Sequence, residues 1–328
     1  MIENMHGTNS ETGPIFIVGS GRSGTSVLTW SLGQHPNVLP LPETHWIARL
    51  TVHMRQLFQF GTSQGQYTHL GALDWNEDDF FREFGHFVNQ FVVNTREPRL
   101  RYIRKMTAQK LGLTLEEVLE LEKQGKLSPD VNLVTAKNYQ LVRSSVDPKC
   151  RWVDGTPENT HYMFSLARAF PNAKFIHLLR NPNSVARSLM GFSSVGAGGI
   201  DHTEQEAYSA WMKYVHSAVK GEEALGPDRV LRVIYEDLIE DPEAMLKKCF
   251  SFFGEDFVSA TVLPFNEKIN SSSSSYKEKY ETVTEASREA NKFYNKIMKE
   301  GQSKRVKDKS LKELTENYQN YANCIHQL

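Results

Sequence analysis

Short apolar runs alternate with amphipathic stretches along most of the chain, and this alternation predicts its main elements. The run at 14–18, PIFIV, is rich in β-branched residues and ends in glycines, which indicates a buried parallel strand. The stretch that follows, TSVLTWSLGQ, places Val27, Leu28 and Leu32 on one face of a helix, with Pro36 after its end. A strand, a glycine-rich turn and a helix therefore open the ordered part of the chain.

The middle of the chain has a helical and charged pattern. Between about residues 46 and 146 we find no convincing strand, and Thr114 and Glu117 have the spacing of a capping box at a helix start. We interpret 46–146 as a helical insertion that covers the site and shapes the substrate pocket. Its many aromatic residues could line an apolar pocket, although packing among the helices would explain them as well.

Strand signals return after this insertion. RWVD is followed by a helix that we expect to begin near Pro157, with Thr156 as its cap. KFIHLL (174–179) and DRVLRVI are further strands, each followed by a helix, and a helical segment covers about 284–328. Strands that alternate with helices predict a three-layer α/β/α fold with a central parallel sheet, in a single domain over 1–328. Ligands of such sheets bind at the carboxyl ends of the strands.

Composition narrows the class of protein. The chain has 328 residues, 39% of them hydrophobic, and a formal net charge of -1. This balance argues against nucleic acid as a partner. Three cysteines, Cys150, Cys249 and Cys324, are too few and too far apart for a disulfide framework or a zinc site. Since the N-terminus lacks an apolar signal region and no apolar run is long enough to span a membrane, we expect a cytoplasmic protein.

The turn after the first strand is similar to a nucleoside-triphosphate loop but differs at one position. Gly19 and Gly24 have the spacing of G-x-x-x-x-G-K-[ST], Ser26 occupies the Ser/Thr position, and Thr25 replaces the lysine. Such a turn offers backbone N–H groups and the positive end of a helix dipole to an anion. The strands KFIHLL and RVLRVI contain no acid that would hold Mg²⁺, so the loop suits a phosphate more than Mg·ATP. The expected anion-binding residues are Gly21, Arg22, Ser23, Gly24, Thr25 and Ser26.

Three segments together resemble one family. PIFIVGSGRSGTS resembles the 5′-phosphosulfate loop of sulfotransferases that use 3′-phosphoadenosine 5′-phosphosulfate (PAPS). In LLRNPNSVARSL, Arg180 and Ser188 resemble the family's 3′-phosphate site, and RVIYEDLIEDPE is similar to its Y-E-D-[LM]-x-x-D-P segment, which implies that Tyr235 contacts the adenine. The resemblance covers most of the chain but is thin over 46–146. It is closest to the branch with protein-tyrosine and carbohydrate sulfotransferases and bacterial relatives.

The resemblance also implies a catalytic base. HPNVLPLPET is similar to a segment of the tyrosylprotein branch that carries a glutamate base, which places the role on Glu43, 21 positions after Arg22. His45 is the second candidate. That branch has a lysine where this chain has Gly155, so Arg22 or another cation must stabilise the leaving phosphate. Lys277 is a candidate, and the serines at 272–275, Ser274 among them, could donate to a phosphate if their loop closes over the nucleotide.

These observations lead to one expected function and two alternatives. We expect a sulfotransferase that moves a sulfuryl group from PAPS, without a metal, to a hydroxyl of a small molecule, lipid or sugar, by in-line transfer. A phosphotransferase or nucleotide kinase with a degenerate loop is the first alternative. A nucleotide-binding module without catalysis is the second. The sequence identifies neither the acceptor nor the oligomeric state, and a homodimer is possible.

Overall fold

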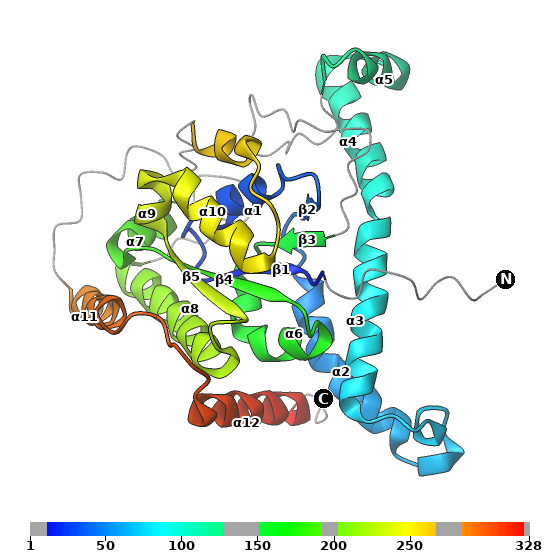
Figure 1. Cartoon of the computed structure of the whole chain (residues 1–328), viewed down its shortest axis with the longest axis vertical. Coiled ribbons are helices and arrows are strands. Elements are labelled where there is room, and N and C mark those ends of the chain that lie inside the picture. Colours follow the sequence, from blue (N-terminus) through cyan, green and yellow to red (C-terminus); the bar gives the residue numbers. More distant parts are fainter. Residues whose placement is uncertain (1–11, 128–150, 192–202, 267–283, 325–328) are drawn as a thin grey trace.

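A parallel sheet of five strands forms the centre of the molecule, in the order β2-β3-β1-β4-β5. The computed structural model describes residues 12–127, 151–191, 203–266 and 284–324 (Figure 1). Its strands are β1 (Ile15–Val18), β2 (Val38–Pro40), β3 (Arg151–Asp154), β4 (Lys174–Leu179) and β5 (Val230–Ile234). The parallel sheet of the predicted α/β fold is confirmed, with β4 at the predicted bounds. β2 was not predicted, because it has only three residues and contains Pro40.

Helices cover both faces of this sheet. The α-helices are α1 (Thr25–Leu32), α2 (Trp46–Thr62), α3 (Glu77–Asn94), α4 (Arg96–Leu111), α5 (Leu115–Lys123), α6 (Met163–Ala169), α7 (Pro182–Met190), α8 (Glu204–Leu225), α9 (Tyr235–Glu240), α10 (Pro242–Phe253), α11 (Glu285–Glu300) and α12 (Asp308–Cys324). Short 3₁₀ helices lie at Gly65–Tyr67, Leu70–Ala72, Pro157–Tyr162 and Ser259–Phe265.

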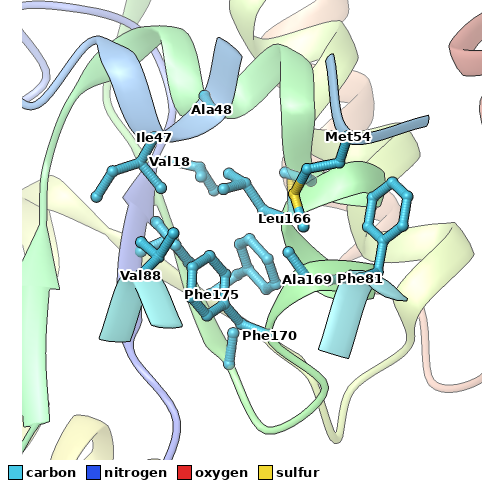
Figure 2. Packing of buried hydrophobic residues seen from close by; sticks show 14 of the residues in the cluster. Val18, Ile47, Ala48, Met54, Phe81, Val88, Leu166, Ala169, Phe170 and Phe175 are labelled. Atoms are coloured by element: carbon cyan, nitrogen blue, oxygen red, sulfur yellow. The ribbon is translucent and has the colours of Figure 1, made fainter. Parts of the chain in front are cut away.

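Alternation along β1 builds the three layers. Phe16 and Val18 point to one face, where they pack with residues of α2, α3 and α6; Figure 2 shows Val18 in this cluster. Ile15 and Ile17 point to the other face and pack with residues of α1 and α10. All four side chains are fully buried. A strand that is apolar at every position therefore reports a sheet covered on both sides.

The stretch from residue 46 to 127 is helical, with no strand among these described residues. α3 and α4 run almost end to end along one side of the sheet and carry α5 beyond it (Figure 1). The capping box of Thr114 and Glu117 is present at the start of α5, as predicted. Residues 128–146, the rest of the predicted insertion, lie outside the described residues.

One long helix was missed by sequence reasoning. α8 has 22 residues, begins with a capping box of Thr203 and Glu206, and packs against α7, α11 and α12. Cys249 is a free, fully buried thiol in the core, whereas the side chains of Cys150 and Cys324 lie outside the described residues. Within the parts of the chain that the structure describes, no helix is long and apolar enough to cross a membrane.

Candidate active site

The glycine-rich turn links the end of β1 to the start of α1 and has an unusual backbone. Gly19, Arg22 and Gly24 all have positive φ angles, of 135°, 66° and 98°. A Cβ atom on Gly24 would lie 2.5 Å from Cε2 of Tyr235, so this position also needs a residue without a side chain. The turn is thus held tightly against the start of α9.

The predicted cofactor-binding residues of the turn occupy different environments. Ser23 and Thr25 are buried, Ser26 is exposed at the start of α1, and Gly21 lies beside Pro157. The Ser23 hydroxyl is buried and has no hydrogen-bond partner among the described residues. A buried hydroxyl without a partner is costly, and a bound anion would satisfy it.

Three residues from other elements contact this turn: one at the end of β4, one on α7 and one at the start of α9. Nε of Arg22 donates to Oγ of Ser188 at 3.0 Å, and Nη1 of Arg180 donates to the carbonyl of Arg22 at 2.8 Å. The Arg180 guanidinium lies over the Tyr235 ring, 4.2 Å from its centroid. The structure therefore brings together Arg22, Arg180, Ser188 and Tyr235, which are up to 213 positions apart in the sequence.

Electrostatics at this meeting point favour an anion. Burial lowers the pKa of Arg22, nearby Arg180 lowers it further, and Glu43 opposes both. Nε of Arg180 is buried and lacks a hydrogen-bond partner among the described residues. Two guanidinium groups held this close repel each other, and a doubly charged phosphate or phosphosulfate would relieve the repulsion.

Glu43 and His45 lie on the segment between β2 and α2, together with a third ionisable group. Nε2 of His45 is 3.2 Å from Oε2 of Glu43, and its Nδ1 is 3.6 Å from Oε2 of Glu158. His45 has a left-handed backbone, with φ of 52°, which turns its ring between the two carboxylates. Burial raises the pKa of Glu43, His45 lowers it, and Glu158 and Asp154 raise it. A carboxylate whose pKa is raised binds a proton more readily, which is what a general base requires.

A buried carboxylate holds this segment in place, and sequence reasoning gave it no role. Asp154, fully buried at the end of β3, accepts four hydrogen bonds, from the hydroxyl of Thr44, the amide and hydroxyl of Thr156, and the side-chain amide of Asn159, at 2.6–2.9 Å. Its position after a strand was the available signal. Thr156 occupies the predicted cap position, before a 3₁₀ helix that begins at Pro157, but its side chain makes no capping bond: its hydroxyl donates to Asp154 and accepts from the Thr44 amide.

The backbone at Gly155 leaves no room for a lysine at this position. A Cβ atom there would lie 2.2 Å from Oγ1 of Thr29, whose hydroxyl donates to the Thr25 carbonyl inside α1. β3 therefore runs so close to α1 that a larger side chain at 155 would force a shift. In the described part of the chain, Arg22 and Arg180 are the cations that meet the turn.

A tyrosine on the unpredicted helix α8 packs against His161 and feels the charge of the carboxylates on the segment of Glu43. The Tyr214 ring lies 4.5 Å from the ring of His161, centroid to centroid. Burial raises the pKa of Tyr214 to about 12, and the carboxylates of Glu158 and Glu43 contribute to the rise. Its phenol thus stays protonated near the candidate base and can donate a hydrogen bond. Nothing in the sequence near residue 214 distinguishes it from a core tyrosine.

Ser274 and Lys277, the remaining predicted cofactor-binding residues, lie outside the described residues, as do the other serines of 272–275. Among the side chains that are described, no group of three or more His, Cys, Asp or Glu residues could hold a metal ion. The backbone amides of the turn, its two guanidinium partners and the nearby carboxylate can together hold an anion beside a base.

Comparisons with known proteins agree with these features. Residues 14–259 match the model of the sulfotransferase family. Omega-hydroxy-beta-dihydromenaquinone-9 sulfotransferase Stf3 of Mycobacterium tuberculosis is 28% identical over 105 residues, which are 30% of this chain and 27% of that protein. An uncharacterized protein of Aquifex aeolicus is 25% identical over 252 residues, 73% of this chain and 25% of that protein. The chain spans about a quarter of the length of these relatives.

Among solved structures, the sulfotransferase domain from the curacin biosynthetic pathway is similar, with 19% identity and a TM-score of 0.44. The match covers 87% of this chain and 98% of that domain.

Proposed function

The chain belongs to the sulfotransferase family, and from this premise we propose that it transfers the sulfuryl group of PAPS to a hydroxyl acceptor. One observation carries the proposal. Arg22, Arg180, Ser188 and Tyr235, which the family resemblance assigns to the nucleotide, contact one another at the glycine-rich turn. Two buried polar atoms at this turn, the Ser23 hydroxyl oxygen and Nε of Arg180, have no hydrogen-bond partner among the described residues. Leaving them unpaired costs stability, and a bound ligand would remove that cost.

The residues fit the two charged ends of PAPS. The amides of the turn from Gly21 to Ser26, with the Ser23 hydroxyl, would hold the 5′-phosphosulfate at the N-terminus of α1. Arg180 and Ser188 would hold the 3′-phosphate, and Arg22 lies between the two positions. One face of the Tyr235 ring is covered by Arg180, so the adenine would use the ring's other face or its edge.

Glu43 would take the acceptor's proton. As the acceptor oxygen forms its bond to sulfur, the bond between sulfur and the 5′-phosphate oxygen breaks, and the hydroxyl proton passes to the Glu43 carboxylate. The products are a sulfate ester and 3′,5′-adenosine bisphosphate (PAP). Arg22 and the turn amides would stabilise the negative charge on the leaving phosphate, which is the larger part of catalysis in such transfers.

Thermal unfolding with PAP tests the nucleotide site. PAP at a hundred times its dissociation constant should add about 2.7 kcal/mol of stability, seen as a rise in Tm. Arg180→Ala should abolish the rise. Arg187→Ala changes an exposed arginine on α7, the helix that follows Arg180; it should leave the rise intact and serves as the matched control. A rise with Mg·ATP and none with PAP would reject PAPS as the donor.

A further inference from the structure

Six aromatic rings of α2 and α3 contact one another in series, and we call them the aromatic strip. They are, in order, Phe58, Phe80, Phe84, Phe87, Phe91 and Trp46, with centroid distances of 5.5, 4.7, 6.5, 6.4 and 5.8 Å between neighbours. These distances lie within the range in which aromatic pairs attract each other. The strip is therefore a continuous apolar surface.

The strip begins in the core and ends in solvent. Phe80 is only 4% exposed, whereas Phe87 is 66%, Phe91 49% and Trp46 41% exposed. The core-facing positions of α3 are filled by other residues, such as Phe81, which Figure 2 shows within the cluster. Packing between helices thus explains the inner part of the strip and leaves the outer three rings without a structural role.

The exposed end of the strip lies beside the candidate base. Trp46 directly follows His45, and its amide donates to the Thr44 carbonyl at 2.5 Å, which folds this segment into a tight turn. His45 in turn contacts Glu43 at 3.2 Å. The last ring of the strip therefore belongs to the same short segment as Glu43, three positions along the chain.

We propose that the aromatic strip binds the alkyl chain of a long-chain alcohol and presents its terminal hydroxyl to Glu43. This inference rests on the proposed function, because it names the acceptor class of the same site. From Phe84 to Phe91, α3 rises by about 10 Å, and the contact with Trp46 extends the apolar path further. The strip ends in the segment that carries Glu43, and this continuity favours a bound alcohol over a second copy of the chain.

Quenching of tryptophan fluorescence by alkanols that carry bromine next to the hydroxyl tests the proposal without nucleotide or turnover. Of the chain's five tryptophans, Trp30, Trp152 and Trp211 are buried, so a Trp75→Phe background leaves Trp46 as the exposed emitter. Because the hydroxyl end is expected beside Trp46, 2-bromooctan-1-ol and 2-bromodecan-1-ol (bromodecanol below) should both quench Trp46 saturably. The longer alkanol should bind about fourfold more tightly for each added methylene that the strip covers.

Two variants locate the binding surface. Phe87→Ser should weaken bromodecanol binding by about tenfold or more, because one exposed ring of the strip is lost. Phe60→Ser removes an even more exposed ring, 77% exposed, on α2 outside the strip, and should leave the affinity unchanged. Equal effects of the two variants would overturn the proposal.

The remaining outcomes are also decisive. If acrylamide quenches Trp46 and the bromoalkanols do not, the strip is open but binds no alcohol, and the proposal fails. If neither quenches, another part of this chain or a second copy covers the strip, and the proposal fails as well. PAP binding, measured separately, shows in each case whether the proposed function still stands.

Discussion

Replacing Asp154 by alanine tests whether this buried carboxylate positions the catalytic segment. It accepts hydrogen bonds from Thr44, Thr156 and Asn159 and lies at the end of β3. After truncation the Thr44 hydroxyl can rotate toward water, since Thr44 is only partly buried. The amide and the hydroxyl of Thr156 and the side-chain amide of Asn159 cannot, because both residues are fully buried.

The loss in stability follows from these three trapped donors. Each buried donor left without a partner costs about 1–3 kcal/mol, so Asp154→Ala should lower the free energy of unfolding by about 3–9 kcal/mol. At roughly 2 °C per kcal/mol for a chain of this size, Tm should fall by roughly 6–18 °C. Activity should fall as well, because Thr44 adjoins Glu43, and a displacement of about 1 Å can cost ~10²-fold in rate.

Asp154→Asn is the matched control. The oxygen of the new asparagine can still accept from Thr156. Its amide can donate to Oδ1 of Asn159 after the Asn159 side-chain amide rotates by half a turn, and that Oδ1 has no hydrogen-bond partner among the described residues. We expect a loss of only about 1–2 kcal/mol. Differential scanning fluorimetry gives both Tm values, and turnover is followed as PAP released from PAPS.

The positioning argument has a clear point of failure. If Asp154→Ala unfolds within about 2 °C of the unmodified protein, the four hydrogen bonds carry little stability and the reasoning is wrong. If it unfolds earlier but retains full turnover, Asp154 supports the fold alone and does not position Glu43.

The pH profile of kcat/KM reports on Glu43, whose pKa burial raises, so the acid limb of the unmodified protein should have its midpoint above 4.5. His45→Ala removes a partner that lowers the pKa of Glu43 and should move the acid limb to higher pH. Glu158→Gln removes a charge that raises this pKa and should move the limb to lower pH. If both variants shift the limb in the same direction, Glu43 is not the group that titrates. Gly155→Lys should destabilise the protein by about 1–3 kcal/mol through the clash with Thr29. Thr29→Ala in the same chain should restore most of that loss in Tm, and a double variant no more stable than Gly155→Lys would exclude the clash as the cause.

Local patterns predicted the elements that depend on neighbouring residues. The run from Ile15 to Val18 forms a strand because it is apolar throughout, and the spacing of Thr114 and Glu117 closes a capping box within four residues. The glycine-rich turn was equally readable, since Gly24 must adopt a conformation that other residues avoid. Short or mixed segments were not readable, and β2, with three residues and a proline, is the example.

The sequence by itself determined a parallel α/β sheet with a glycine-rich turn after its first strand, because strand periodicity and backbone conformation are set by residues close together in the chain. Only the tertiary structure decided what surrounds that turn. It paired the Thr156 hydroxyl with Asp154 and Thr44 instead of with the helix end, packed Tyr214 against His161, and excluded a side chain at position 155. These outcomes depend on distances between elements far apart in sequence, which are fixed when the helices pack on the sheet and bury their apolar faces.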